Sequence, residues 1–238
     1  MRKITDNAVT FLSLGPGDPD LLTMEAVSVL RTADVVMLPA TKTDGEGRVK
    51  SRAAAIVSKR CATEKLKFFE LPMQKDRQAV MTVYDRLYRE AADRYRAGQR
   101  VVVAVEGDAG IYASINYVLE RLQAEGVAVR QLPGIPSFIA AASRAGLSLV
   151  SQRQRMTVLP GDADVETLSW LLTHNHVVVL MKLSGCQLAV KDFLRANPSA
   201  TCHYFENVGS ADEFYTTAHE VILDREMPYF SLCILYPL

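Results

Sequence analysis

Cysteine is scarce in this sequence of 238 residues, which contains Cys61, Cys186, Cys202 and Cys233. They form no C-x-x-C pair and no Cys/His cluster with zinc-ligand spacing, which argues against a disulfide framework or a metal site. A charge excess is also lacking, because 27 Lys and Arg residues balance 27 Asp and Glu residues. Without a global basic field we expect no nucleic-acid partner, although a local cluster of cations can still bind an acidic small molecule.

Long hydrophobic runs are absent as well. The longest apolar stretches, such as residues 101–105 and 177–181, are strand-sized and too short to cross a membrane. Residues 1–7 are polar and lack the apolar core of a signal peptide. We therefore expect a cytoplasmic protein with no membrane partner.

Short apolar runs alternate with segments of helical periodicity along the first part of the chain. Runs at residues 8–14, 34–39, 101–105 and 127–132 predict buried strands, and residues 77–97 and 111–124 predict amphipathic helices. A further helix is expected after Asp18, because this N-cap residue precedes Pro19 at the first helical position. Strands that alternate with helices pair in parallel through right-handed crossovers, so the predicted fold class is α/β.

A dense group of chain breakers, residues 133–136, suggests a boundary between a domain of residues 1–132 and one of residues 133–238. In the second part, residues 156–159, 177–181 and 201–205 predict strands, and residues 137–145, 165–173 and 185–196 predict helices. The tail predicts short strands at 214–218 and 229–236 without a helix between them. The second sheet is therefore expected to be mixed.

The first loop with chemical potential is Gly15-Pro16-Gly17-Asp18, the GPGD loop, which follows the first predicted strand. Ligands of open parallel sheets bind at such strand ends. The loop does not complete the dinucleotide pattern G-x-G-x-x-G, because the sixth position is Asp20, and it lacks the Gly-Lys-Ser/Thr of a P-loop. Taken alone, it is better explained as a tight turn with a helix cap.

The second loop, residues 106–112, is the EGD loop, and it follows the apolar strand at 101–105. The carboxylates of Glu106 and Asp108 can accept hydrogen bonds from a cofactor and tolerate a nearby sulfonium charge, while glycine allows close backbone approach. The alternative is that Glu106 or Asp108 simply caps the next helix. The third loop, residues 133–137, is the PGI loop, and taken alone it is a linker turn capped by Ser137.

Together, the three loops occur in the order and at the separations that resemble the tetrapyrrole (corrin and porphyrin) methylase family. The stretch from Leu14 to Met24, LGPGDPDLLTM, resembles that family's amino-terminal signature. Within the family, the chain is most similar to the branch that methylates C20 of precorrin-2 or cobalt-factor II. Two positions depart from the pattern: Ala109 stands where proline is frequent, and Glu25 where a basic residue is common.

The resemblance implies two α/β domains with an interdomain cleft, the class III methyltransferase fold, and a homodimer. The implied cofactor is S-adenosyl-L-methionine. Carried over by motif, the residues implied to contact it are Pro16, Glu106, Gly107, Asp108, Ile111, Pro136, Ser137, Met181 and Val208, with Gly209 as the alternative to Val208.

The implied substrate is a reduced tetrapyrrole with many carboxylate arms, which call for cations. Its expected contacts are Gly15, Asp18, Lys42, Arg48, Lys50 and Arg52, with Arg153, Arg155 and Lys182 as further cations. The ring carbon is already nucleophilic, so alignment with the activated methyl is the main task and no covalent residue is required. Glu106 and Asp108 are candidate proton acceptors. We expect Arg52→Ala to raise the KM of the tetrapyrrole more than that of the cofactor.

Other residues and other functions remain to be weighed. His174 and His176 are interpreted as turn residues rather than metal ligands, and Trp170 as a helix-packing residue. The alternative functions are methylation at another tetrapyrrole carbon (C2/C7, C11 or C17) or of the diphthamide precursor. A nucleotide-binding regulatory or redox module is disfavoured by the incomplete G-x-G-x-x-G pattern, and a pure scaffold by glycine loops clustered at strand ends.

Overall fold

The computed structural model describes residues 8–41, 50–71 and 77–238. The chain divides into two compact units, Met1–Pro136 and Ser137–Leu238. The sequence suggested a boundary between residues 132 and 133, but residues 133–136 lie with the first unit. One reason is that the backbone N–H of Gly134 donates to Asp108, which belongs to that unit.

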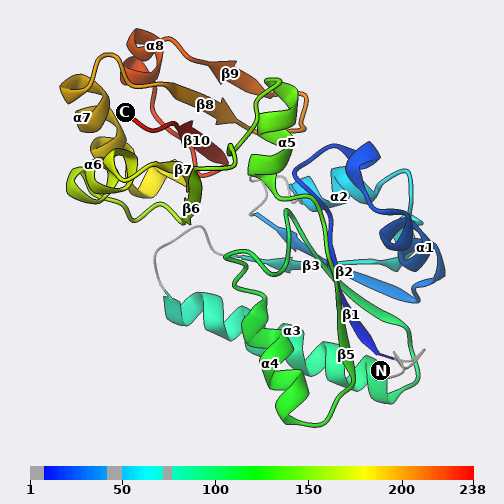
Figure 1. The fold of residues 1–238 in the computed structure, drawn as a ribbon. Helices are drawn as coiled ribbons and strands as arrows, with labels where there is room; N and C mark the ends of the chain where they lie inside the picture. The colour runs from blue at the N-terminus through cyan, green and yellow to red at the C-terminus, as the bar shows by residue number, and fades with distance from the viewer. Residues whose placement is uncertain (1–7, 42–49, 72–76) are drawn as a thin grey trace. The chain divides into compact units, whose positions relative to one another are not determined.

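Five parallel strands form the sheet of the first unit, in the order β3-β2-β4-β1-β5 (Figure 1). They are β1 (Val9–Ser13), β2 (Val35–Ala40), β3 (Leu66–Glu70), β4 (Val101–Val105) and β5 (Val129–Leu132). The α/β prediction is confirmed. β3 was not expected from the sequence, because this edge strand exposes Lys67, Phe68 and Glu70 and so has no continuous apolar run.

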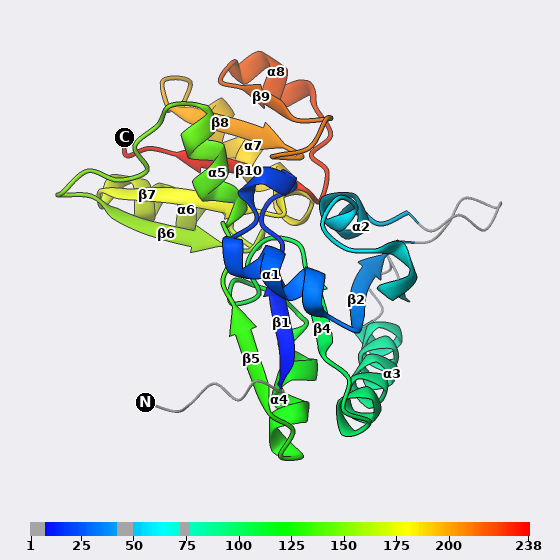
Figure 2. The same ribbon diagram turned by 90° about the vertical axis from the view of Figure 1, so that its right-hand side faces the viewer.

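Helices cover both faces of this sheet (Figures 1 and 2). Successive side chains of a strand point to opposite faces, so Leu12 joins the core under α1 and α2, while Phe11 joins the core under α3 and α4. Burial on both faces explains the continuous apolar runs of β1 and β4. The helices are α1 (Met24–Thr32), α2 (Arg52–Val57), α3 (Arg77–Arg96) and α4 (Asn116–Ala124), with 3₁₀ turns at Pro19–Leu21 and Thr63–Lys65.

Two helix starts differ from the sequence expectation. Asp18 caps the 3₁₀ turn Pro19–Leu21, accepting from the backbone N–H of Asp20, and α1 begins later with Thr23 as its N-cap. The helix expected from residue 111 begins at Asn116. Neither Glu106 nor Asp108 caps it, so the capping interpretation of the EGD loop is wrong.

The sheet of the second unit is mixed, as expected, in the order β6-β7-β10-β8-β9. β6 and β7 are parallel, whereas β10 runs antiparallel to both β7 and β8. The strands are β6 (Arg155–Leu159), β7 (His176–Met181), β8 (Cys202–Glu206), β9 (Phe214–Thr216) and β10 (Ser231–Leu235). A helix lies between β9 and β10, so the prediction of a helix-free tail is wrong. This helix, α8 (His219–Asp224), buries Ile222 alone and shows no readable periodicity.

The helices of the second unit pack on both faces of its sheet. α5 (Ser137–Arg144) lies on one face, opposite α6 (Val165–Thr173) and α7 (Gln187–Ala196) (Figures 1 and 2). A 3₁₀ turn, Leu183–Gly185, precedes α7. Trp170 was expected to pack inside a helix interface, but it is 56% exposed and stacks on His174 with ring centroids 4.3 Å apart. It lies on the exposed side of α6, whose buried side is formed by Leu168, Leu171 and Leu172.

The structure bears on the cysteines, on metal sites and on membrane-spanning helices. The four cysteines are free and buried. Among residues 8–41, 50–71 and 77–238, no group of His, Cys, Asp and Glu side chains has the geometry of a metal site. No helix in this part of the chain is long and apolar enough to span a membrane.

Candidate functional site

The three loops singled out by sequence lie side by side in the first unit. β1 is hydrogen-bonded to β4 on one side and to β5 on the other, and all three strands run in the same direction. The GPGD, EGD and PGI loops leave the carboxyl ends of these strands, so they meet at one edge of the sheet. This is the edge at which the sequence predicted a ligand site.

A pair of glycines joins the GPGD loop to the EGD loop. The N–H of Gly15 donates to the carbonyl of Gly107 at 3.1 Å, and the N–H of Gly107 donates to the carbonyl of Gly15 at 2.7 Å. Both residues have positive φ, 75° for Gly15 and 74° for Gly107, a region that favours glycine. A Cβ at Gly107 would meet nothing within 4 Å, so open space lies beside this backbone, where a ligand can approach.

The carboxylate of Asp108 joins the EGD loop to the PGI loop. One oxygen accepts from the N–H of Gly110 at 2.7 Å, and the other accepts from the N–H of Gly134 at 2.8 Å. Both oxygens are therefore engaged by backbone donors. Asp108 therefore holds the EGD and PGI loops together. This favours a structural or binding role for its carboxylate over the role of a proton acceptor.

Ala109, one of the two departures from the family pattern, adds a third link. Its backbone N–H donates to the Oγ of Ser13, the last residue of β1, at 2.9 Å. Proline has no N–H and could not make this bond. The other departure, Glu25, lies 3.7 Å from the guanidinium of Arg130 on β5.

Gly134 occupies the tightest position among the loops. A Cβ added there would lie 2.6 Å from the Cβ of Ser13 and 3.0 Å from the carbonyl oxygen of Gly107. The first distance is too short for real atoms and the second is tighter than most real contacts, so the PGI loop packs against β1 and the EGD loop at a distance that glycine alone permits.

The side chain of Glu106 contacts the first turn of α2. Its Oε2 accepts from the Nε of Arg52 at 3.2 Å, and the backbone N–H of Ala53 also donates to its carboxylate. Burial raises the pKa of Glu106 above its ordinary value, and Arg52 and Ala53 offset this only in part. Arg52 was expected to be a cation for the substrate, and the structure brings it against a carboxylate of the EGD loop.

The other expected cations lie at different places. Lys42 and Arg48 fall outside the described residues. Lys50 is exposed and forms an isolated bridge with Thr41, next to the start of α2. Arg153 and Arg155 lie at the amino end of β6, together with His176 at the start of β7, and so at the opposite edge of the second sheet from Lys182.

The second unit gathers its own loops at one sheet edge. β6, β7 and β8 point in the same direction, so residues 160–162, 182–186 and 207–213 follow at the same edge. A Cβ at Gly161 would lie 2.5 Å from the carbonyl oxygen of Lys182 and 2.8 Å from that of Met181. As in the first unit, glycine allows one loop to pack against the backbone of its neighbour.

The expected cofactor residues of the second unit lie at or near this edge. Met181 ends β7 and is half-buried, whereas Val208 is buried and follows β8. The N–H of Gly209 donates to Glu213 at 2.5 Å, and Glu213 also lies 3.3 Å from Arg144 at the end of α5. The loop after β8 is thereby held to the helix that begins at Ser137.

Sequence analysis missed two aromatic residues at the same edge. Tyr229 is 48% and Phe230 40% exposed, with their rings 5.2 Å apart, and the Nζ of Lys182 lies 5.6 Å from the Tyr229 ring. They were included in the strand predicted at 229–236, although β10 begins at Ser231. The Pro228 that precedes them is a chain breaker, which could have separated them from the strand.

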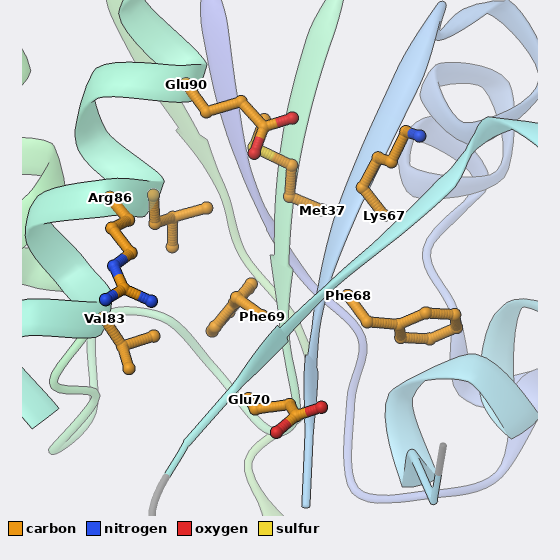
Figure 3. Close-up of a pocket in the computed structure, with 9 residues that line it drawn as sticks. Met37, Lys67, Phe68, Phe69, Glu70, Val83, Arg86 and Glu90 are labelled. Atoms are coloured by element: carbon orange, nitrogen blue, oxygen red, sulfur yellow. The ribbon is translucent and has the colours of Figure 1, made fainter. Parts of the chain in front are cut away.

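A cavity of about 340 Å³ lies elsewhere in the first unit, and its lining belongs to β2, β3 and α3 (Figure 3). Its apolar lining residues include Phe69 and Met37, and Phe68 points to the other side of β3. Its rim carries both signs of charge, since Lys67 and Arg86 are accompanied by Glu70 and Glu90. This mixture does not suit a ligand with many carboxylates, so we do not assign the tetrapyrrole to it.

Comparison with known proteins decides the family. The family model described as Tetrapyrrole (Corrin/Porphyrin) Methylases matches residues 8–221. The chain belongs to the tetrapyrrole methylase family. The resemblance carried by the three loops is thereby confirmed.

Relatives of this tetrapyrrole methylase, and solved structures of similar fold, match nearly its whole length. It is 28% identical over 228 residues to a cobalt-precorrin-2 C(20)-methyltransferase from Salmonella typhimurium, covering 94% of each chain. It is 31% identical to a precorrin-2 C(20)-methyltransferase from Sinorhizobium sp., covering 93% of this chain and 91% of the relative. The fold is similar to that of uroporphyrin-III C-methyltransferase from Thermus thermophilus, solved with S-adenosylhomocysteine (TM-score 0.68, 21% identity, 96% and 97% covered).

Proposed function

We propose that this tetrapyrrole methylase transfers a methyl group from S-adenosylmethionine to C20 of precorrin-2 or of cobalt-factor II in cobalamin biosynthesis. The relatives named for this reaction match over nearly the full chain. The observation that carries the proposal is the meeting of the GPGD, EGD and PGI loops at one sheet edge, with open space beside Gly107.

The residues of this edge fit S-adenosylmethionine chemically. Backbone amides and carbonyls of tight turns can bind its amino acid and nucleoside parts, and the carboxylates of Glu106 and Asp108 favour a positive sulfonium nearby. In the second unit, Tyr229 and Phe230 offer apolar surface for a flat ring. We propose cofactor contacts at Pro16, Glu106, Gly107, Asp108, Ile111 and Pro136 in the first unit and at Ser137, Met181 and Val208 in the second.

The chain's own contribution to the reaction is alignment. When bound, S-adenosylmethionine would supply an electrophilic methyl group to an electron-rich ring carbon. The S–CH3 bond would break as the C–C bond forms, S-adenosylhomocysteine would leave, and the methylated carbon would later lose a proton. Orientation of two reactants can supply about 7–11 kcal/mol of such a barrier. The bonds between Gly15 and Gly107 and from Gly134 to Asp108 give the loops the rigidity that orientation requires. No residue needs to form a covalent bond.

Carboxylate arms of the substrate require cations near the loops. We propose that Lys50 and Arg52, with Lys42 and Arg48, serve this purpose, and that Gly15 and Asp18 contact the macrocycle. Lys182 is the corresponding cation of the second unit. Arg153 and Arg155 are left out, because they lie at the far edge of their sheet.

Incubation of the protein with methyl-labelled S-adenosylmethionine and either precorrin-2 or cobalt-factor II tests this function. We expect one methyl group per macrocycle, located at C20 by NMR spectroscopy, and faster turnover with one of the two substrates. A product methylated at another carbon would replace the C20 assignment, and transfer to neither substrate would refute the function. That the enzyme is a cytoplasmic homodimer stays a prediction, which light scattering and cell fractionation can check.

A further inference from the structure

Glu106 connects two parts of the first unit that are far apart in sequence. It follows Val105, the last residue of β4, and precedes Gly107, whose backbone is bonded to the GPGD loop. Its side chain reaches the first turn of α2, where the Nε of Arg52 and the N–H of Ala53 donate to it. A carboxylate at this end of a helix meets unsatisfied N–H groups and the positive end of the helix dipole.

The start of α2 is fixed by further bonds to the end of β2. The Oγ of Ser51 accepts from the N–H of Ala54 at 3.1 Å and donates to the carbonyl of Pro39 at 2.6 Å. Next to it, the N–H of Thr41 donates to the carbonyl of Lys50 at 2.9 Å. Lys50 and Arg52, the described cations assigned to the substrate, therefore flank a helix start that β2 and β4 both hold.

The Glu106 side chain is mostly covered, with 20% of its surface exposed, and that of Arg52 is 28% exposed. A covered carboxylate that loses its partner leaves an uncompensated charge, which costs more than the pair itself contributes. Removal of Arg52 should therefore disturb Glu106 and the Gly107 backbone that follows it. Neutralising Glu106 in the same protein should remove that disturbance.

We propose that Glu106 is a positioning residue that couples the cofactor loop to the substrate cations, by holding Arg52 and the start of α2. It acts on the substrate through Arg52 and does not accept the proton released from the methylated carbon. This inference rests on the proposed function, and it gives the cofactor and substrate contacts of the first unit a shared structural element.

The test compares Arg52→Ala, Glu106→Gln and the double variant in the full-length protein. S-adenosylhomocysteine binding is measured by titration calorimetry, and KM and kcat are measured with precorrin-2. We expect Arg52→Ala to weaken S-adenosylhomocysteine binding ~10-fold, about 1.4 kcal/mol, and to raise the KM of precorrin-2 by a larger factor. Adding Glu106→Gln should restore binding to within ~3-fold of wild type, but should leave the KM of precorrin-2 high.

Two results would overturn the proposal. The first is unchanged S-adenosylhomocysteine binding in Arg52→Ala, which would make Arg52 a substrate cation without coupling. The second is a collapse of kcat in Glu106→Gln with normal binding of both ligands, the signature of a proton acceptor. If wild-type protein neither binds S-adenosylhomocysteine nor methylates precorrin-2, the proposed function itself fails, a result distinct from both.

A matched control lies at the opposite ends of β4 and β2. Arg100 and Asp34 form an ion pair at the amino ends of β4 and β2, with 57% and 36% of their side chains exposed. Arg100→Ala should leave both binding and KM unchanged. Should Arg52→Ala fail to fold by circular dichroism, Arg52→Lys keeps the charge without the Nε donor. It should weaken binding ~3-fold, and wild-type binding in that variant would contradict the coupling.

Discussion

In the part of the chain that the structure describes, a Glu–Arg pair with a covered carboxylate lies at the end of a strand in each unit, and the two pairs differ in the number of donors. Glu106, after β4, receives Arg52 through one nitrogen at 3.2 Å and the N–H of Ala53. Glu206, which ends β8, receives the Nε of Arg225 at 2.7 Å, its Nη2 at 3.0 Å and the hydroxyl of Tyr204 at 2.7 Å. The second carboxylate therefore has the richer set of charge-assisted bonds.

As a result, the pKa values of the two carboxyl groups are shifted in opposite directions. Burial raises the pKa of Glu106 above 4.5, because its donors offset the loss of solvation only in part. Burial also acts to raise the pKa of Glu206, but Arg225 and Tyr204 outweigh it and hold that pKa below 4.5. The comparison teaches that the number and geometry of donors decide whether a covered carboxylate is stable as an anion.

The largest effect is expected from breaking the richer pair. Arg225→Ala leaves Glu206 as a buried anion and should lower the free energy of unfolding by about 3 kcal/mol, the lower end for such pairs because Arg225 is 36% exposed. Urea denaturation measures this value. Arg225→Ala with Glu206→Gln should recover part of the loss, and a loss below about 1 kcal/mol would show that Glu206 is well solvated.

Removal of one donor from the same pair should have a smaller effect. Tyr204→Phe keeps the buried ring and deletes the hydroxyl that donates to Glu206, so we expect a loss of about 1.5 kcal/mol in the free energy of unfolding. The same denaturation experiment measures it. Equal stability of the variant and wild type would mean that Arg225 alone satisfies the carboxylate.

The opposite pKa shifts predict that the two carboxyl groups make the free energy of unfolding depend on pH with opposite signs. Because the pKa of Glu106 is raised in the folded state, its contribution to stability is present below pH 4.5 and declines as the pH rises through the raised pKa. Because the pKa of Glu206 is lowered, its contribution is present above pH 4.5 and is lost as the pH falls. Denaturation of Glu106→Gln and Glu206→Gln from about pH 3 to 7, each relative to wild type, should show slopes of opposite sign, for Glu206 below pH 4.5 and for Glu106 above it.

The smallest effect is expected from the exposed pair that serves as the reference. Arg100 holds the pKa of Asp34 well below its ordinary value through side-chain and backbone hydrogen bonds. Solvent screens this interaction, so Asp34→Asn should leave the Tm unchanged within error in a thermal melt at neutral pH. A clear drop in Tm would show that pairing strength in this protein does not follow burial.

The meeting of the three loops could be predicted from the sequence, because parallel strands expose their carboxyl ends at one edge and the motifs followed apolar runs. The partner of Glu106 could not be predicted in this way. Arg52 lies on a helix of six residues, too short for a readable periodicity. Its contact joins this helix, which follows β2, to the end of β4, and these two strands are adjacent in space but not in sequence. The same shortness hid α8.

The structure also separates residues that the sequence treated alike. Lys182, Arg153 and Arg155 were grouped as cations by type, but strand direction places the two arginines at the opposite sheet edge. Tyr229 and Phe230 were assigned to a strand by their β propensity, although they precede it. Composition and propensity do not record the direction of a side chain or the end of a strand, and both properties depend on tertiary pairing.

The close packing of Gly134 against Ser13 has a consequence for attempts to change what this enzyme methylates. Gly134 has no side chain, and the space that a side chain would need is occupied by Ser13 and by the backbone of Gly107. Any substitution of Gly134 therefore disturbs the turn instead of changing the choice of substrate. A mutant library aimed at new macrocycles should leave that glycine untouched and diversify Lys50, whose exposed side chain can change size and charge without moving the turn.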